Sequence, residues 1–120
     1  MINSRIERLI GEAEGAAQLD SAMLERAADV LRRVFPEADL PVAAPSDPVG
    51  QALHLVEAFL PTWTIRLTGN ATGPDGHWHC SLRESPGSDE DELIGFGSGR
   101  VIGLAVVAAL LRVARARAAH

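Results

Sequence analysis

The sequence predicts an α+β fold: an N-terminal αα-hairpin followed by an α-β-β-β-α sandwich with a three-stranded antiparallel sheet. Three observations predict this class. Apolar residues recur at helical spacing through residues 3–35, apolar and polar residues alternate after Pro61, and an alanine-rich apolar segment closes the chain. With 120 residues, the chain is long enough for one domain with its own core. We expect a helical hairpin over 1–35 packed on this core, a proline-rich linker over 36–46 and the α-β-β-β-α unit over 47–120.

The hairpin is predicted from two apolar stripes with helix-start signals before them. Ser4 and Glu7 form a capping box for the first helix, and Asp20 or Ser21 caps the second, which Pro36 stops. Each stripe must be buried against another element. The first stripe is Ile2, Ile6, Leu9, Ile10 and Ala13, and the second is Leu24, Ala27, Ala28, Leu31, Val34 and Phe35.

The third helix is predicted to begin after Ser46 or Asp47, with Pro48 in its first turn, and to end at Pro61. Two strands follow, in TWTIRLT and GHWHCSLRE, and a short third strand covers Glu92 to Gly97. The period of two places one set of side chains on the core side of the sheet. This set is Trp63, Ile65, Leu67, Trp78, Cys80 and Leu82.

The final helix is predicted from about Gly99 to Ala118, and it is apolar on every side between Val101 and Leu111. A helix on one sheet needs only one apolar stripe, so a second element must cover this one. Either the N-terminal hairpin or the same helix of a second copy can do so. The second alternative predicts a homodimer, with self-association through Gly103, Val106, Ala109 and Leu110. Eleven apolar residues are too few for a membrane span, which needs about twenty.

Composition and charge narrow the classes of function. Cys80 is the single cysteine and the N-terminus has no apolar signal segment, so we expect a cytoplasmic protein. All eleven basic residues are arginine, so arginine is the default cation here and does not by itself indicate phosphate recognition. Net charge is −5, although residues 93–120 carry four arginines and no acidic residue. Basic residues at a helix C-terminus complement the helix dipole.

Several segments of the chain resemble a group of small uncharacterised phage and prophage proteins, whose domain is called the phage ABA sandwich. The similar segments are RIERLIGEAEG, LDSAML, SDPVGQALHLVEAFLPTWTIRL, the W-x-x-x-L of WHCSL, and GLAVVAALLRVA. Residues 36–45 are less regular than in that group, and Arg100-Val101-Ile102 stands where a Thr-Pro-type helix start is common. The resemblance implies an α/β sandwich and a phage-related origin, and it implies no reaction.

Two groups of residues are candidates for a ligand site. The first is Gly97, Ser98, Gly99 and Arg100, because backbone N–H groups at a helix start can hold an anion. The dinucleotide fingerprint G-x-G-x-x-G fails at Arg100, and the favoured explanation of the glycines is a tight turn and close approach of helix and sheet. The second is the polar sheet face, where two histidines at i and i+2 lack the third ligand that zinc requires. We therefore expect no metal or cofactor. The sheet-face residues are Arg66, His77, His79 and Arg83.

A third candidate surface is acidic and lies in the loop before the third strand. Such a run is usually a solvated loop, and the alternative is a surface that occupies a basic groove on a partner. Its residues are Glu84, Asp89, Glu90, Asp91 and Glu92.

The order helix-strand-strand-strand-helix also occurs in double-stranded RNA-binding domains. The only basic residue at the last helix start is Arg100, which argues against nucleic-acid binding. No catalytic triad or separated carboxylate pair is assignable. We therefore predict a non-enzymatic, phage-derived interaction or assembly module that binds a phage or host protein. The alternatives are a small-ligand or nucleotide-binding module and an acidic inhibitor of a basic host partner.

Overall fold

The computed structural model describes residues 2–38, 47–69, 77–84 and 94–118. Within these residues there are four helices and one antiparallel sheet of three strands, which confirms the predicted α+β class. None of the helices so described has the length and apolar character needed to cross a bilayer. In chain order the elements are α1 (Ile2–Gly15), α2 (Ser21–Val34), α3 (Pro48–Phe59), β1 (Thr64–Gly69), β2 (Trp78–Arg83), β3 (Ile94–Gly99) and α4 (Ile102–Ala118).

The sheet has the order β1-β2-β3, and its register confirms the predicted alternation. Ile65 lies opposite Leu82, and Leu67 lies opposite Cys80, so these side chains share the face that is packed on the core. On this face, Leu82 and Cys80 of β2 are buried, whereas Ile65 and Leu67 of β1 are only half-buried. The two tryptophans also pack against the core, from opposite ends of the β1–β2 pair.

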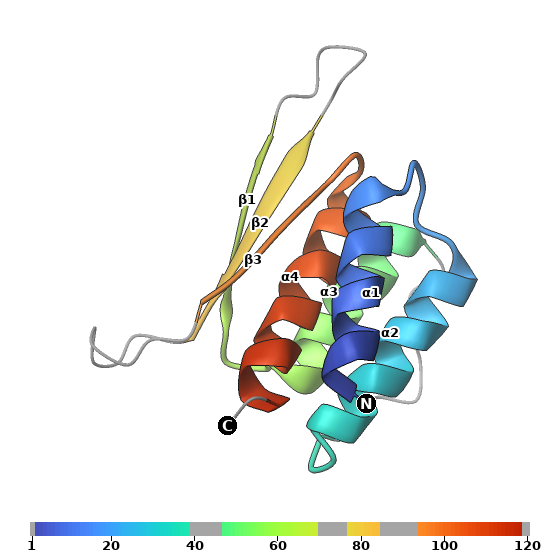
Figure 1. Cartoon of the computed structure of the whole chain (residues 1–120). Helices are drawn as coiled ribbons and strands as arrows, with labels where there is room; N and C mark the ends of the chain where they lie inside the picture. The colour runs from blue at the N-terminus through green and yellow to red at the C-terminus, as the bar shows by residue number, and fades with distance from the viewer. Residues whose placement is uncertain (1, 39–46, 70–76, 85–93, 119–120) are drawn as a thin grey trace.

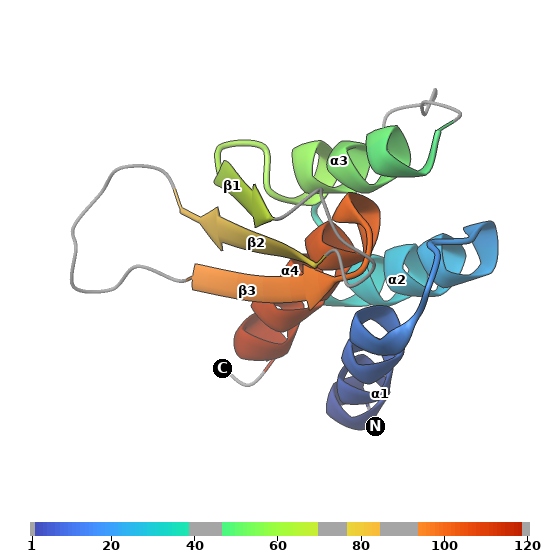
Figure 2. The same ribbon diagram turned by 90° about the horizontal axis from the view of Figure 1, so that it is seen from above.

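Helix α4 lies at the centre of the molecule. One side of it packs on β2 and β3, and the other sides contact α1, α2 and α3 (Figure 1). Seen from above, α1 and α3 flank α4, and α2 lies on the side away from the sheet (Figure 2). The second cover that the sequence required is therefore supplied by helices of the same chain.

The burial of α4 corrects the predicted self-association surface. Val106, Ala109 and Leu110 are at most 1% exposed within a single chain. Gly103 is buried next to Leu19, which lies in the segment between α1 and α2. Because the chain's own helices already cover this surface, it is not available to a second copy.

Glycines on the inner face of β3 bring this strand directly against α4. A Cβ atom built on Gly97 would lie 2.3 Å from the carbonyl oxygen of Ala105 and 2.3 Å from the amide nitrogen of Ala109. Built Cβ atoms on Gly95 and Gly99 would also meet α4, at 2.4 and 2.7 Å. The glycines thus allow the helix backbone to approach the strand closely. They belong to the strand, since α4 begins at Ile102 and not near Gly99 as predicted.

Aspartate side chains start two of the helices. Asp20 accepts a hydrogen bond from the Met23 amide at 2.8 Å, and Asp47 accepts one from the Gly50 amide at 2.7 Å. These caps confirm the predicted starts of α2 and α3. The capping box predicted at Ser4 is wrong, because α1 already begins at Ile2 and Ser4 lies inside it.

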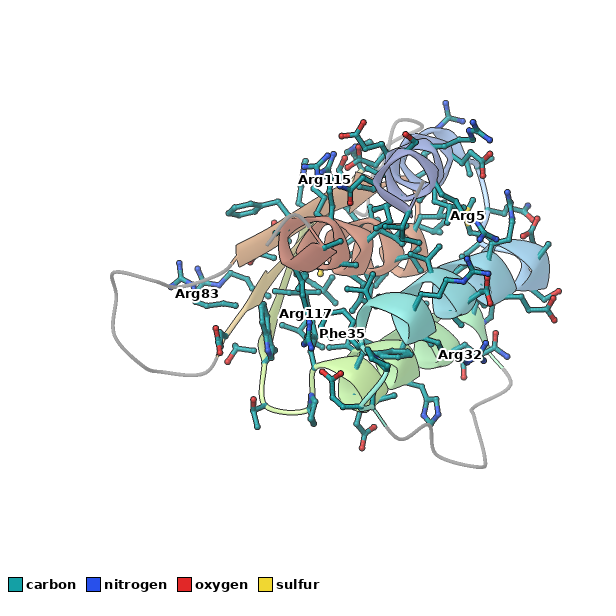
Figure 3. All side chains as sticks on the ribbon, turned by 60° about the horizontal axis from the view of Figure 1, so that its bottom comes forward. Arg5, Arg32, Phe35, Arg83, Arg115 and Arg117 are labelled. Atoms are coloured by element: carbon teal, nitrogen blue, oxygen red, sulfur yellow. The ribbon has the colours of Figure 1, made fainter. Side chains whose placement is uncertain are left out.

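A cation–π contact ties the end of α4 to the end of α2. The guanidinium of Arg117 lies 4.4 Å from the ring centre of Phe35, and it also pairs with Glu37 (Figure 3). The apolar stripes of α1 and α2 are otherwise buried as predicted, with Ile2 and Val34 only partly covered.

Candidate functional site

The candidate site lies on the face of the sheet that points away from α4, which we call the outer face. In register, Arg66 lies opposite Ser81 and Ser81 opposite Phe96, while Thr68, His79 and Ser98 form the neighbouring row. Among the outer-face side chains that the structure describes, none is acidic, although the whole chain has a net charge of −5. The described outer-face residues are Thr64, Arg66, Thr68, His79, Ser81, Arg83, Phe96 and Ser98.

Phe96 is an apolar residue on this polar face. Its side chain is 60% exposed, and among the described residues it is the only large hydrophobic residue that is exposed. The glycines on either side of it face α4, so the alternation of the strand directs Phe96 outward. A single exposed apolar side chain is common on protein surfaces, and Phe96 is a candidate ligand contact because it lines a cavity.

An open cavity of about 310 Å³ lies on the outer face between Phe96 and β1. This volume is at the lower end of the range for small-molecule sites. Ser81 occupies the central position between Arg66 and Phe96, and its small side chain leaves space between the two larger ones. The outer-face residues that line the cavity are Arg66, Thr68, His79, Ser81, Phe96 and Ser98.

An ion pair borders the cavity at the edge of β3. Arg112 from α4 makes a two-point contact with Glu14 from α1, in which Nη2 donates to Oε1 at 2.8 Å. Arg112 Nη1 also donates to the carbonyl oxygen of Phe96 at 2.7 Å. The Ser98 amide donates to Glu14 Oε2 at 3.2 Å, and its hydroxyl lies 3.3 Å from the same oxygen. The pair therefore joins α1 and α4 to the backbone of the edge strand.

This pair determines the charge of Glu14. The hydrogen bonds from Arg112 lower the pKa of the Glu14 carboxyl, against the opposing effect of partial burial. The same contact raises the pKa of Arg112. Glu14 is thus anionic at neutral pH and its charge is balanced locally, so it does not cancel the positive charge of Arg66 across the cavity.

The first predicted ligand site has a different geometry from the one its sequence suggested. Gly97, Ser98 and Gly99 lie in β3, and Arg100 is an exposed residue between β3 and α4. The Ser98 amide, a candidate for holding an anion, donates to the chain's own carboxylate at Glu14. The glycines serve the packing of α4 on the sheet.

The second predicted site is brought together only in part. Arg66 and His79 line the cavity. His77 precedes β2, and its ring centre lies 5.3 Å from that of His79. Arg83 lies at the other end of β2, opposite Thr64, where Figure 3 shows its side chain directed away from the helices. In the part of the chain that the structure describes, no three metal-ligating side chains come together.

Cys80 lies on the inner face of β2 and is buried. Burial raises the pKa of its thiol to about 11, so the sulfur is protonated at neutral pH and is neither a nucleophile nor a metal ligand. The acidic candidate surface lies outside the described residues except for Glu84, which is exposed.

Five residues at the site were not among the candidates from the sequence: Thr68, Ser81, Phe96, Glu14 and Arg112. The period of two in IGFGSG places Phe96 opposite the glycines, so this signal was available. No local signal identifies Glu14 and Arg112, which lie 98 positions apart.

Comparisons of the chain with protein-family models, with curated proteins and with solved structures found no match. The resemblance to the phage ABA sandwich domain therefore stays a prediction. The geometry of the outer face is the basis for assigning a function.

Proposed function

We propose that the protein is a non-enzymatic binding module that holds a small phosphorylated ligand with a planar ring, such as a nucleotide, on the outer face of its sheet. The observation that carries the proposal is an exposed Phe96 ring on the same cavity as Arg66 and His79. Aromatic side chains stack on bases, and the arginine guanidinium matches the geometry of phosphate oxygens. The small Ser81 between them leaves room for a sugar.

The groups that line the cavity support binding more than catalysis. Glu14 is engaged by Arg112 and by the Ser98 amide, so its carboxylate is not free to act as a base. The Cys80 thiol is buried on the opposite face and protonated. What remains is an arginine, an imidazole, hydroxyl groups and one aromatic ring. These groups recognise an anion and a ring without forming a nucleophile–base pair.

The resemblance to phage and prophage proteins supports a phage-derived setting for this role. A single buried cysteine suits a reducing cytoplasm. The partner in assembly, phage or host, stays a prediction. Inhibition of a basic host partner also stays a prediction. The acidic residues of this chain that would bind such a partner lie almost entirely outside the described residues.

The test is calorimetric titration with adenosine and guanosine mono-, di- and triphosphates. Adenosine and ribose 5-phosphate serve as ligands with the ring alone and the phosphate alone. We expect the complete nucleotides to bind more tightly than either part. Phe96→Ala should weaken binding by roughly 5- to 150-fold, since stacking of a base on an aromatic ring contributes about 1–3 kcal/mol. Arg66→Ala should weaken it by roughly 10-fold or more, since a charge-assisted hydrogen bond contributes about 1.5–3 kcal/mol.

The matched control is Arg8→Ala, which removes an exposed arginine from α1, away from the cavity. It should leave nucleotide affinity unchanged. All three variants should keep the far-UV circular dichroism of the wild type, because the replaced side chains are exposed. The proposal is abandoned when no nucleotide binds at millimolar concentration, or when Phe96→Ala and Arg66→Ala bind as the wild type does.

A further inference from the structure

The two edges of the sheet differ in the state of their backbone hydrogen-bonding groups. At the β3 edge, the Ser98 amide donates to Glu14 and the Phe96 carbonyl accepts from Arg112. Side chains of α1 and α4 therefore occupy this edge. The β1 edge receives no such contact from any residue that the structure describes, and the nearest loop hydrogen bond joins the Trp63 amide to the Leu60 carbonyl.

The register identifies which groups of β1 point outward. In an antiparallel pair, alternate residues direct both backbone groups at the partner strand, and the residues between them direct both away. Ser98 and Phe96 point away from β2, so Gly97 bonds with Cys80, and His79 and Ser81 must face β1. Their partners are Thr68 and Arg66. It follows that Ile65 and Leu67 direct their N–H and C=O groups away from the sheet.

The side chains along β1 indicate the chemistry that a further strand would need. On the inner face, Ile65 and Leu67 are only half-buried, next to a half-buried Trp63. On the outer face, Arg66 is exposed, and the described outer face has no acidic residue. A strand beside β1 would place its side chains alternately against the apolar inner set and beside Arg66.

We infer that the β1 edge binds an extended peptide strand of another protein, in which apolar and acidic residues alternate. The apolar residues lie beside Ile65 and Leu67, and an acidic residue lies beside Arg66. Main-chain hydrogen bonds from Ile65 and Leu67 supply the register, and the alternating side chains supply the specificity. The β1 edge and the proposed nucleotide site have one residue in common, Arg66.

Charge argues for a different protein in preference to a second copy. Pairing β1 with β1 of a second copy would join two outer faces that carry arginine and, in their described residues, no acid. With the two-fold axis at Arg66, the two arginines would lie directly opposite each other, and like charges in that position are destabilising. An acidic strand gives complementary charge in the same place.

The experiment uses an acetylated and amidated eight-residue peptide that alternates glutamate and valine, titrated into the full chain. Two N-methylated forms provide a matched pair. The peptide is expected to pair antiparallel to β1, with each valine opposite Ile65 or Leu67. In this pairing, methyl groups on the valine nitrogens remove the N–H groups that face β1, and methyl groups on the glutamate nitrogens modify only the far side. We expect the first form to lose binding and the second to bind. In amide-exchange measurements, peptide binding should slow exchange at Ile65 and Leu67.

Reversing one charge tests the side-chain chemistry. With the wild type, a lysine–valine peptide should bind roughly 2- to 30-fold more weakly than the glutamate–valine peptide, and Arg66→Glu should invert this preference. Phe96→Ala should leave peptide binding unchanged while it weakens nucleotide binding, so the two proposals fail separately. The inference is overturned if both N-methylated peptides bind equally, or if neither charge pattern is preferred. A concentration-dependent dimer that protects Ile65 and Leu67 without peptide would also overturn it, in favour of a second copy.

Discussion

Replacing Gly97 with alanine tests whether α4 rests directly on the backbone of β3. The added Cβ atom would lie 2.3 Å from the Ala105 carbonyl oxygen and from the Ala109 amide nitrogen. Ordinary contacts of a Cβ atom begin at 3.4 Å. Both obstructing atoms belong to the helix backbone, so no side chain can rotate away, and α4 must move from the strand by roughly 1 Å.

This movement affects the most buried element of the molecule. Overpacking a core costs about 1–3 kcal/mol and sometimes more, and we expect about 3 kcal/mol because the overlap is with backbone on two sides. For a chain of this size, 1 kcal/mol corresponds to about 4 °C in the midpoint of thermal unfolding. The expected fall is therefore about 12 °C for Gly97→Ala, measured by circular dichroism and by urea unfolding.

Gly11→Ala is the matched control, because the same substitution is made where there is space. Gly11 lies inside α1, and a Cβ atom there would have no neighbour within 4 Å. Alanine is the better helix former by about 0.8–1 kcal/mol, so this variant should be slightly more stable than the wild type. A loss below about 1 kcal/mol in Gly97→Ala would contradict direct contact between α4 and β3.

Three further predictions concern single side chains. Glu14→Gln should lower stability at pH 7 by about 1–3 kcal/mol. The pKa of Glu14 is lowered in the folded state, so the contribution of its carboxylate to stability is complete above the ordinary value of 4.5 and is lost as the pH falls through the folded pKa. A difference in stability between wild type and Glu14→Gln that stays constant down to pH 2 would contradict this. Cys80 should react with a disulfide reagent far more slowly in the native protein than in denaturant, because its thiol is buried and its pKa is raised to about 11; equal rates would show that β2 does not shield it. Asp20→Ala should cost about 1 kcal/mol in urea unfolding, and Asp20→Asn much less, because asparagine also accepts from the Met23 amide; equal losses would point to a role other than capping.

Much of the fold could be predicted because its signals are local. Asp20 and Asp47 precede helical stripes, and the alternation of Ile65, Leu67, Cys80 and Leu82 specifies which face of the strands is buried. The third strand and the last helix were predicted with their boundary too early. Gly99 was predicted at the start of the helix, whereas it is the last residue of β3. The predicted close approach of helix and sheet at these glycines is confirmed.

The candidate site could be predicted only in part. Arg66 and His79 were identified, because strand alternation places polar residues on one face. Glu14 and Arg112 meet only because α1 and α4 both lie against β3, and no pattern within a window of sequence reports a contact between positions 98 apart. For the same reason, no sequence signal indicates that the Ser98 amide already donates a hydrogen bond to Glu14.

The sequence by itself thus determined the elements, their buried faces and the need for a second cover on α4. These follow from periodicity and capping, which depend on neighbours along the chain. Only the tertiary structure decided that the cover comes from α1, α2 and α3 of the same chain, which buries Val106 and Leu110. It also decided that the β3 edge is closed by Glu14 and Arg112. The physical reason is that hydrophobic burial has no direction, so an apolar helix surface can be covered by any apolar partner. The path of the chain in three dimensions decides which helices cover it.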